Sequence, residues 1–243
     1  MLRLLALLYG LIGYVVFLGA FLYLIGFVGN RYTFSTVDSG LQIPAGEAFL
    51  VNLALLAGFA MQHSIMARRG FKKYWRRIVP APVERTTYVM ASSVTLAAIF
   101  RYWEPMPDLV WFTQNPAAVM ALHVLFWAGW AMVVAASVQI GHAELFGLRQ
   151  VWLYARGKPY TPPAFHAPGF YRYLRHPMMV GMVAGFWSTP EMSQGHLMLA
   201  GFLTLYVVAA RKLEERDLRR DHGSVYESYM RRVAAYWPRR LRP

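Results

Sequence analysis

Two polar clusters hold the side chains of this chain that could do chemistry. The first is Arg175-His176-Pro177, whose proline is typical of the first turn of a helix, where no amide donor is needed. Arg175 and His176 would then lie beside free backbone N–H groups and the positive end of the helix dipole, which favours a bound carboxylate or phosphate. The alternative is ordinary packing at a membrane surface, with an arginine that extends toward water.

The second cluster is Arg211-Lys212-Leu213-Glu214-Glu215. Glu214 lies about one helical turn from Arg211, so these two side chains share a face. Carboxylates in such a place can hold an ammonium group or the hydroxyls of a ribose. The alternative is a solvated helix end with ion pairs inside the helix. An apolar segment joins the two clusters, and if it folds back on itself it brings them together.

Composition places both clusters in a membrane protein. The chain has 243 residues, of which 57% are hydrophobic and only 15% are charged, and its mean hydropathy is +0.31. A soluble domain usually carries about 25% charged residues. The net charge is +13, but the basic residues stand in short blocks between long apolar runs, which argues against a nucleic-acid-binding face. The absence of cysteine excludes disulfides, Fe–S clusters, cysteine-ligated zinc and a catalytic cysteine.

The apolar runs predict an all-α fold, a polytopic membrane helical bundle, because about 20 apolar residues cross a bilayer as one helix. The long spans expected are Leu4–Val28, Ala48–Ala67, Thr86–Trp103 and Ala117–Ile140. The first is expected to be retained, since no small-residue cleavage site follows it. Another apolar segment, Met178–Ala210, is interrupted at Thr189-Pro190-Glu191. It predicts a hairpin of two short helices, with a re-entrant pair as the alternative.

Two connecting segments are too long to be simple turns. Prolines and glycines make much of His142–His176 irregular. The segment from Arg211 onward is expected to begin as a charged helix, to break at Gly223, to resume over Tyr226–Val233 and to end near Pro238. A site is expected where these two segments meet the ends of the membrane helices.

The distribution of charge predicts the orientation of the chain. Of the 25 Lys and Arg residues, only Arg31 and Arg101 fall in the loops expected on one side of the membrane. Basic residues concentrate on the cytoplasmic side of membrane proteins. Both termini are therefore expected in the cytoplasm, with the protein in a bacterial-type inner (plasma) membrane. Part of the excess charge also suits contact with anionic lipid.

Three groups of residues in the C-terminal half occur together: Arg175-His176-Pro177 with Gly181, then Glu214-Glu215-Arg216-Asp217-Leu218, then Gly223, Tyr226, Tyr229 and Pro238. This set resembles the isoprenylcysteine carboxyl methyltransferase superfamily. Those integral-membrane enzymes bind S-adenosylmethionine between such a hairpin and the cytoplasmic segments that flank it. Met178-Met179 departs from the superfamily, which often has a tyrosine two places after the proline. No Gly-X-Gly-X-X-Gly occurs, so a Rossmann-type cofactor fold is excluded.

Further motifs narrow the resemblance: Gln62-His63-Ser64-Ile65-Met66-Ala67-Arg68, Val79-Pro80, Val83-Glu84-Arg85-Thr86-Thr87-Tyr88, Leu145-Phe146-Gly147-Leu148-Arg149-Gln150 and Trp187-Ser188-Thr189-Pro190-Glu191-Met192. They resemble the methanethiol S-methyltransferase branch, over nearly the whole chain from Ala48 onward. The resemblance implies methylation of methanethiol to dimethyl sulfide by in-line transfer of a methyl group to the thiolate.

The resemblance also implies where the cofactor binds. Residues expected to bind S-adenosylmethionine are Gln150, Tyr171, Tyr173, Arg175, His176, Pro177, Gly181, Glu214 and Glu215. The superfamily assigns its His-Pro and Glu positions to the cofactor, and tyrosine rings suit its adenine or its sulfonium. The implied organisation is one membrane methyltransferase domain over residues 1–243. A four-helix membrane part would span 1–140, and a cofactor-binding part 141–243 with its hairpin over 178–210.

A thiol acceptor has to lose its proton, because the thiolate is the nucleophile. His63 and His142 are the candidate catalytic bases, with Arg211 as an electrostatic helper. The alternatives are that His63 hydrogen-bonds a neighbouring helix and that His142 only marks the membrane interface. No metal is expected, since the 7 histidines include no pair at the spacing of one helical turn.

The partners expected are a small thiol and membrane lipid, without nucleic acid, and the oligomeric state is not predicted. A second hypothesis keeps the cofactor and changes the acceptor to a prenylcysteine, a lipid or a larger thiol. A third is an NADPH-dependent membrane reductase, since sterol reductases carry a related Arg-His-Pro hairpin. A transporter or channel subunit is a different class, and the near absence of charge from the spans argues against it.

Overall fold

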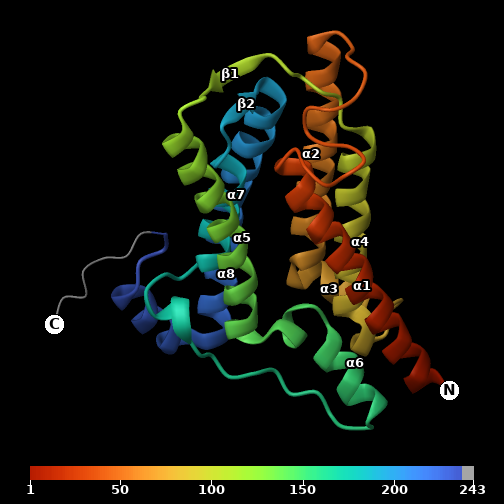
Figure 1. The fold of residues 1–243 in the computed structure, drawn as a ribbon. Coiled ribbons are helices and arrows are strands. Elements are labelled where there is room, and N and C mark those ends of the chain that lie inside the picture. The colour runs from red at the N-terminus through yellow and green to blue at the C-terminus, as the bar shows by residue number, and fades with distance from the viewer. Residues whose placement is uncertain (237–243) are drawn as a thin grey trace. The chain divides into compact units, whose positions relative to one another are not determined.

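The computed structural model describes residues 1–236 and consists of helices and loops with one short two-stranded sheet (Figure 1). The elements, in chain order, are α1 (Leu2–Val28), α2 (Ala45–Ala67), α3 (Arg69–Trp75), α4 (Ala81–Tyr102), β1 (Leu109–Phe112), α5 (Pro116–Leu145), α6 (Leu148–Ala155), η1 (Gly169–Arg172), α7 (Pro177–Trp187), β2 (Glu191–Ser193) and α8 (Gln194–Arg232). The all-α prediction is confirmed.

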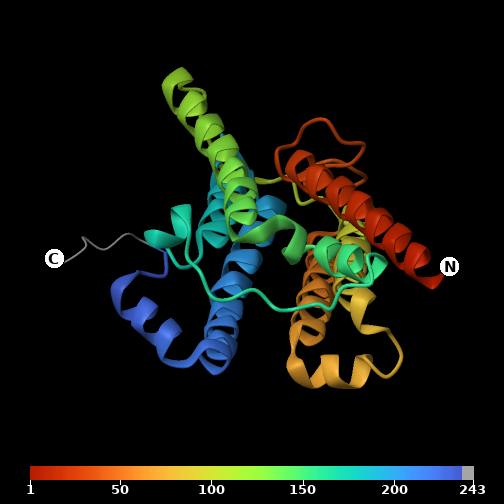
Figure 2. The same ribbon diagram turned by 90° about the horizontal axis from the view of Figure 1, so that it is seen from below.

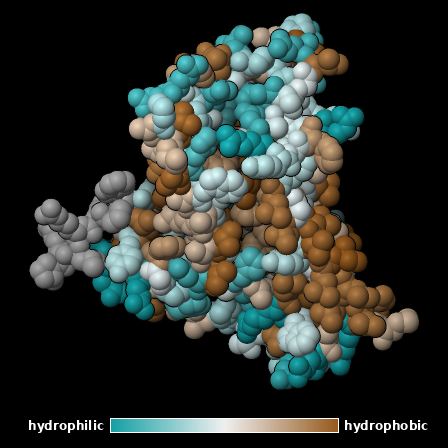
Figure 3. All heavy atoms as spheres, in the orientation of Figure 1, coloured by the Kyte–Doolittle hydropathy of each residue, from teal (hydrophilic) through white to brown (hydrophobic). Residues whose placement is uncertain are grey.

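Among the described residues, α1, α2, α5 and α8 are long and apolar enough to cross a membrane. The protein is therefore an integral membrane protein of the polytopic helical kind. The span predicted over Thr86–Trp103 is also helical, as part of α4, but α4 is not in that apolar group. Glu84, Arg85 and Arg101 lie within α4, which explains its lower hydropathy. Hydrophobic side chains gather over α1 in the space-filling view (Figure 3).

The chain divides into two compact units, which are described separately. The first unit consists of Met1–Leu109, His142–Thr161 and Ser193–His196. In it α1 and α2 pack on α4, and α6 packs on α1 and α4 (Figure 2). Aromatic side chains fill one end of this unit, where Phe27 lies 5.2 Å from Phe100, measured between ring centroids. The indole N–H of Trp103 donates a hydrogen bond of 3.0 Å to the carbonyl of Val37.

The second unit consists of Val110–Gly141, Pro162–Met192 and the chain from Leu197 onward. Helices α5 and α7 approach each other closely in it through glycines. A Cβ atom added at Gly181 would lie 2.5 Å from the carbonyl oxygen of Gly129, and one added at Gly185 would lie 2.7 Å from the ring of Trp130. The small residues of α7 thus allow close contact with another helix.

The predicted break in the last apolar segment is confirmed. Helix α7 ends at Trp187, the chain passes through Thr189 and Pro190, and α8 begins at Gln194. The strands β1 and β2 pair at this break, and the sequence did not predict them. Trp111 stacks on Trp187 with ring centroids 6.3 Å apart, and its indole N–H donates to the carbonyl of Thr189.

The predicted break at Gly223 is confirmed as well. Gly223 adopts φ 52° and ψ −131°, a backbone conformation that glycine reaches without steric cost. The chain continues as a helix to Arg232, close to the predicted end of the second helical part. Pro238, where the sequence placed the end of this segment, lies outside the described residues. The short helix α3 was not predicted, whereas α6 lies in the connector between α5 and α7, where helical structure was expected beside irregular chain.

Candidate functional site

The second unit contains a cavity beside the start of α7. The cavity has a volume of about 200 Å³. One part of its lining is aromatic, from Phe165, Tyr171, Tyr226 and Tyr229. Another part is polar and comes from both clusters found in the sequence, Arg175 and His176 before α7 and Glu214 on α8. The two clusters therefore do come together, as expected.

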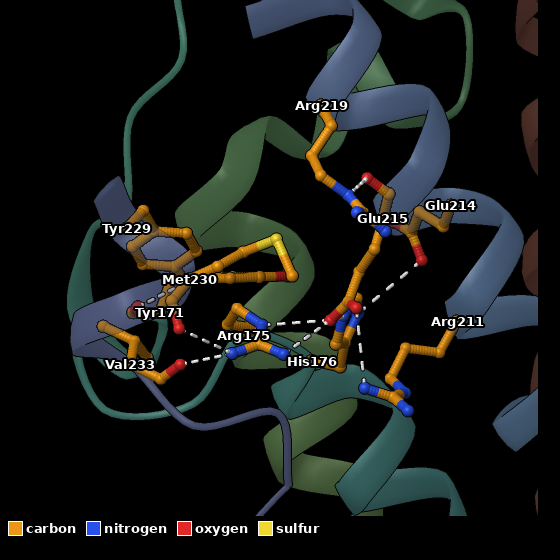
Figure 4. A network of polar contacts seen from close by, with 10 residues as sticks. All are labelled: Tyr171, Arg175, His176, Arg211, Glu214, Glu215, Arg219, Tyr229, Met230 and Val233. Atoms are coloured by element: carbon orange, nitrogen blue, oxygen red, sulfur yellow. Dashed lines mark hydrogen bonds and ion pairs between the residues drawn. The ribbon is translucent and has the colours of Figure 1, made fainter. Parts of the chain in front are cut away.

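Arg175 ties the start of α7 to the end of α8 (Figure 4). Its Nε and Nη2 atoms lie 3.0 Å and 2.9 Å from Oε1 of Glu215. Its Nη1 atom donates to the main-chain carbonyls of Met230 and Val233. This guanidinium is thus occupied by protein acceptors on both edges. A carboxylate of a ligand would have to compete with Glu215 for it, which weakens the role that the sequence suggested.

His176 is buried between two carboxylates. Its Nε2 atom lies 3.0 Å from Oε1 of Glu215, and its Nδ1 atom lies 3.6 Å from Oε2 of Glu214. Its backbone N–H donates to the carbonyl of Ala235, next to the hydrogen bond from Arg175 to Ala234. The position of the ring is therefore fixed by the backbone as well as by the two acidic side chains.

The two neighbouring glutamates have different surroundings. The side chain of Glu215 is 6% exposed and accepts from Arg175, with Nη1 of Arg211 at 3.5 Å. The side chain of Glu214 is 49% exposed and lines the cavity. Glu215 is thus part of the buried framework, whereas the half-exposed Glu214 lines the cavity. Arg211 lies against the ring of Tyr236, 5.1 Å from its centroid.

The aromatic part of the lining is held by contacts among its own members. The centroid of the Phe165 ring lies 5.5 Å from that of Tyr226 and 5.2 Å from that of Tyr229. The hydroxyl of Tyr229 donates a 2.6 Å hydrogen bond to the carbonyl of Tyr171. The hydroxyl of Tyr171 is buried, and within residues 1–236 it has no hydrogen-bond partner. Burial raises the pKa of Tyr171, so the group remains a donor.

Three other residues predicted to bind the cofactor belong to the second unit but do not line the cavity. Pro177 begins α7, as expected. Gly181 faces Gly129 of α5. Tyr173 is 58% exposed. Their roles toward a cofactor remain predictions.

Gln150, His63 and His142 belong to the first unit, where each has a protein partner. The amide of Gln150 donates to Oε1 of Glu144 at 2.7 Å. Nε2 of His63 lies 2.7 Å from the hydroxyl of Tyr88. Nε2 of His142 lies 2.8 Å from the hydroxyl of Tyr14. The contact of His63 agrees with its alternative, a hydrogen bond to a neighbouring helix. The catalytic roles of both histidines remain predictions.

Some lining residues were not identified from the sequence. Phe165 and His166 come from the proline-rich connector, and Leu218 and His222 come from the helical turns after Glu214. Leucine and ring-bearing residues recur every three or four positions along α8, at Leu218, His222, Tyr226 and Tyr229. This spacing could have indicated that they share one face of the helix. Within the described part of the chain, no group of three or more acidic or histidine side chains is placed to hold a metal ion.

Several curated proteins are similar to this chain over nearly its full length. The methanethiol S-methyltransferase of Mycobacterium tuberculosis is 49% identical over 240 residues, which cover 98% of each chain. The methanethiol S-methyltransferase of Crocosphaera subtropica is 43% identical over 97% of this chain and 92% of its own. Nurim of Bos taurus is 32% identical over 75% of this chain and 71% of its own. No protein-family model and no solved structure matches the chain.

Proposed function

The chain belongs to the methanethiol S-methyltransferase family, and from this we propose that it methylates methanethiol to dimethyl sulfide with S-adenosylmethionine as donor. The observation that carries the proposal is the 49% identity to the Mycobacterium tuberculosis enzyme over 98% of both chains. When bound, the donor supplies a methyl group activated by its sulfonium. The protein's part is to bind the donor, to orient the thiol in line with that methyl group and to exclude water.

The lining of the cavity fits such a donor. S-adenosylmethionine combines a flat adenine with a sulfonium, an ammonium and ribose hydroxyls. The rings of Phe165, Tyr226 and Tyr229 offer flat apolar surface for the adenine or the sulfonium. Glu214 offers a carboxylate for the ammonium or for the ribose. The unpaired hydroxyl of Tyr171 offers a hydrogen bond that no described residue accepts.

The proposed setting is the inner membrane of a bacterial-type cell, with both termini and the cavity at the cytoplasmic face. The distribution of lysine and arginine supports this orientation. The donor is a cytoplasmic metabolite, while methanethiol is small and apolar enough to arrive from either phase. This orientation therefore gives both reactants access to one site.

The proposal is tested with purified protein in detergent, methanethiol and S-adenosylmethionine that carries a deuterated methyl group. We expect trideuterated dimethyl sulfide in the headspace, detected by mass spectrometry. Glu214→Gln should weaken donor binding about tenfold, the cost of one charge-assisted hydrogen bond. Glu227→Gln, an exposed glutamate on the same helix, is the matched control and should bind the donor like the wild type.

Acceptors of graded size separate the proposal from its rivals. If a prenylated cysteine or a larger thiol is methylated in preference to methanethiol, the acceptor is wrong while the donor stands. If no labelled methyl group reaches any acceptor and the protein binds NADPH in calorimetry, the methyltransferase proposal fails.

A further inference from the structure

A methyltransferase that acts on a thiol has a task that one acting on a carboxylate does not have. A carboxylate is already ionised near neutral pH, whereas an alkyl thiol holds its proton. Because the thiolate is the nucleophile, a group at the site has to accept this proton. Among the side chains that line the cavity, His176 is placed to accept it.

The surroundings of His176 resemble those of a catalytic base more than those of a ligand for an anion. The ring lines the cavity, and a carboxylate faces each of its nitrogens, Glu215 at 3.0 Å from Nε2 and Glu214 at 3.6 Å from Nδ1. A third anion, such as the carboxylate of a cofactor, would be repelled by these two. A positive charge on the ring would be stabilised by both.

The contacts of Glu215 also indicate which ring nitrogen of His176 would accept a proton. With Arg175 at 2.9 Å and Arg211 at 3.5 Å, Glu215 is held as a buried anion. We assign the proton of the neutral ring to Nε2, where Glu215 can accept it at 3.0 Å, and this tautomer leaves the lone pair on Nδ1. A buried carboxylate that orients a histidine in this way is a recurring device for holding a base in its reactive tautomer. Figure 4 shows His176 between the two glutamates.

We propose that His176 is the general base that removes the thiol proton, with Glu215 as the residue that positions it. This inference rests on the proposed function. The S–H bond breaks and its electron pair stays on sulfur, where it forms the new S–CH3 bond. The bond between the methyl group and the donor sulfonium breaks at the same time, and its electron pair remains on the departing sulfur. The proton passes to Nδ1 of His176 and leaves to water past Glu214, whose side chain is 49% exposed.

Thiols of different acidity test this assignment in the whole purified protein. Trifluoroethanethiol is larger than methanethiol but is a stronger acid, so much of it is already ionised and needs no base. Propanethiol, which is similar to it in bulk and is an ordinary weak acid, is the control for size. In His176→Gln we expect the rate with methanethiol to fall about 100-fold or more, the usual worth of a general base. The rate with trifluoroethanethiol should fall far less, and the affinity for S-adenosylmethionine should stay close to that of the wild type.

His63→Gln and His142→Gln test the two rival bases, and His123→Gln is the control for the substitution itself. A selective loss with methanethiol in either rival, and not in His176→Gln, overturns the proposal. An equal loss with both thiols in His176→Gln does the same, because that pattern indicates a structural or cofactor-binding role. If the wild type methylates neither thiol, the proposed function fails, which is a distinguishable result.

Glu215→Gln tests the positioning role separately. Without the carboxylate the ring is no longer held in its reactive tautomer, so the rate with methanethiol should fall while the rate with trifluoroethanethiol should fall far less. A purely structural role for Glu215 would lower both rates equally.

Discussion

Arg175 contacts three acceptors, the carboxylate of Glu215 and the carbonyls of Met230 and Val233. The side chains of Arg175 and Glu215 are 10% and 6% exposed, so their charges are largely removed from water. Removing one member of such a pair leaves the other charge buried without its partner, and that is more costly than the pair itself is favourable. Arg175, which the sequence suggested as a residue that binds an anion, is thus placed to stabilise the fold around the cavity.

We expect Arg175→Ala to lower the free energy of unfolding by about 3 kcal/mol, within the usual range for breaking a buried ion pair. Thermal unfolding in detergent without donor measures this loss. Arg231→Ala, an exposed arginine near the end of α8, should change the stability little. The double variant with Glu215→Gln should lose less stability than the sum of the two single losses, since each single substitution already breaks the pair. Additive losses would contradict this account.

Unlike Arg175, Tyr171 has a buried polar group, its hydroxyl, that no described residue pairs with. Tyr171→Phe should leave the donor-free protein equally stable or slightly more stable, since a buried unpaired hydroxyl costs free energy. Its affinity for S-adenosylmethionine should fall about tenfold if the ligand accepts this hydrogen bond. Isothermal titration gives the affinity, and the matched control is Tyr102→Phe, at an exposed tyrosine of the first unit.

The sign of the pH dependence follows from burial, which raises the pKa of Tyr171. The protonated form is the one stabilised in the folded protein, so this contribution is complete below the ordinary tyrosine pKa of about 10 and is lost as the pH rises above it. The difference in donor affinity between wild type and Tyr171→Phe should therefore be constant across the neutral range. A difference that changes there would mean that another group is responsible.

Among the secondary-structure elements, the breaks in the helices were predictable from the sequence, because each depends on the residue at the break. Pro190 lies at the break between α7 and α8, and Gly223 lies at the kink in α8, because proline and glycine act on their own backbone. The pairing of β1 with β2 joins segments far apart in the chain, and no local pattern encodes it. The same reason explains Gln150, whose bond to Glu144 depends on how the start of α6 is turned.

The contact between α5 and α7 gives a prediction at this scale. A Cβ atom at Gly181 would lie 2.5 Å from the carbonyl oxygen of Gly129, and neither backbone can move away cheaply. Gly181→Ala should therefore destabilise the donor-free protein by about 1–3 kcal/mol, as overpacking usually does. Gly201→Ala is the control, because a Cβ atom there meets nothing within 4 Å. That variant should be unchanged or up to about 1 kcal/mol more stable, from helix propensity alone.

Over the whole molecule, the distribution of basic residues predicts which loops face the cytoplasm. Arg31 and Arg101 are the only basic residues in the segments expected outside the cytoplasm, although the chain carries 25 Lys and Arg residues. Translocating a basic loop is unfavourable, so one orientation of the helices is favoured over the other. The cavity next to His176 would then open on the side where S-adenosylmethionine is found.

The chain has no cysteine, so single cysteines introduced at exposed positions can report this orientation without background. We expect a membrane-impermeant maleimide to label Leu41→Cys and Gln114→Cys in intact cells, and to label Lys73→Cys and Lys158→Cys only after the membrane is permeabilised. All four positions are exposed, so protection in intact cells reflects the membrane and not burial. The reverse pattern would place the cavity outside the cell, away from its donor, and no residue assignment within the cavity could then rescue the proposed reaction.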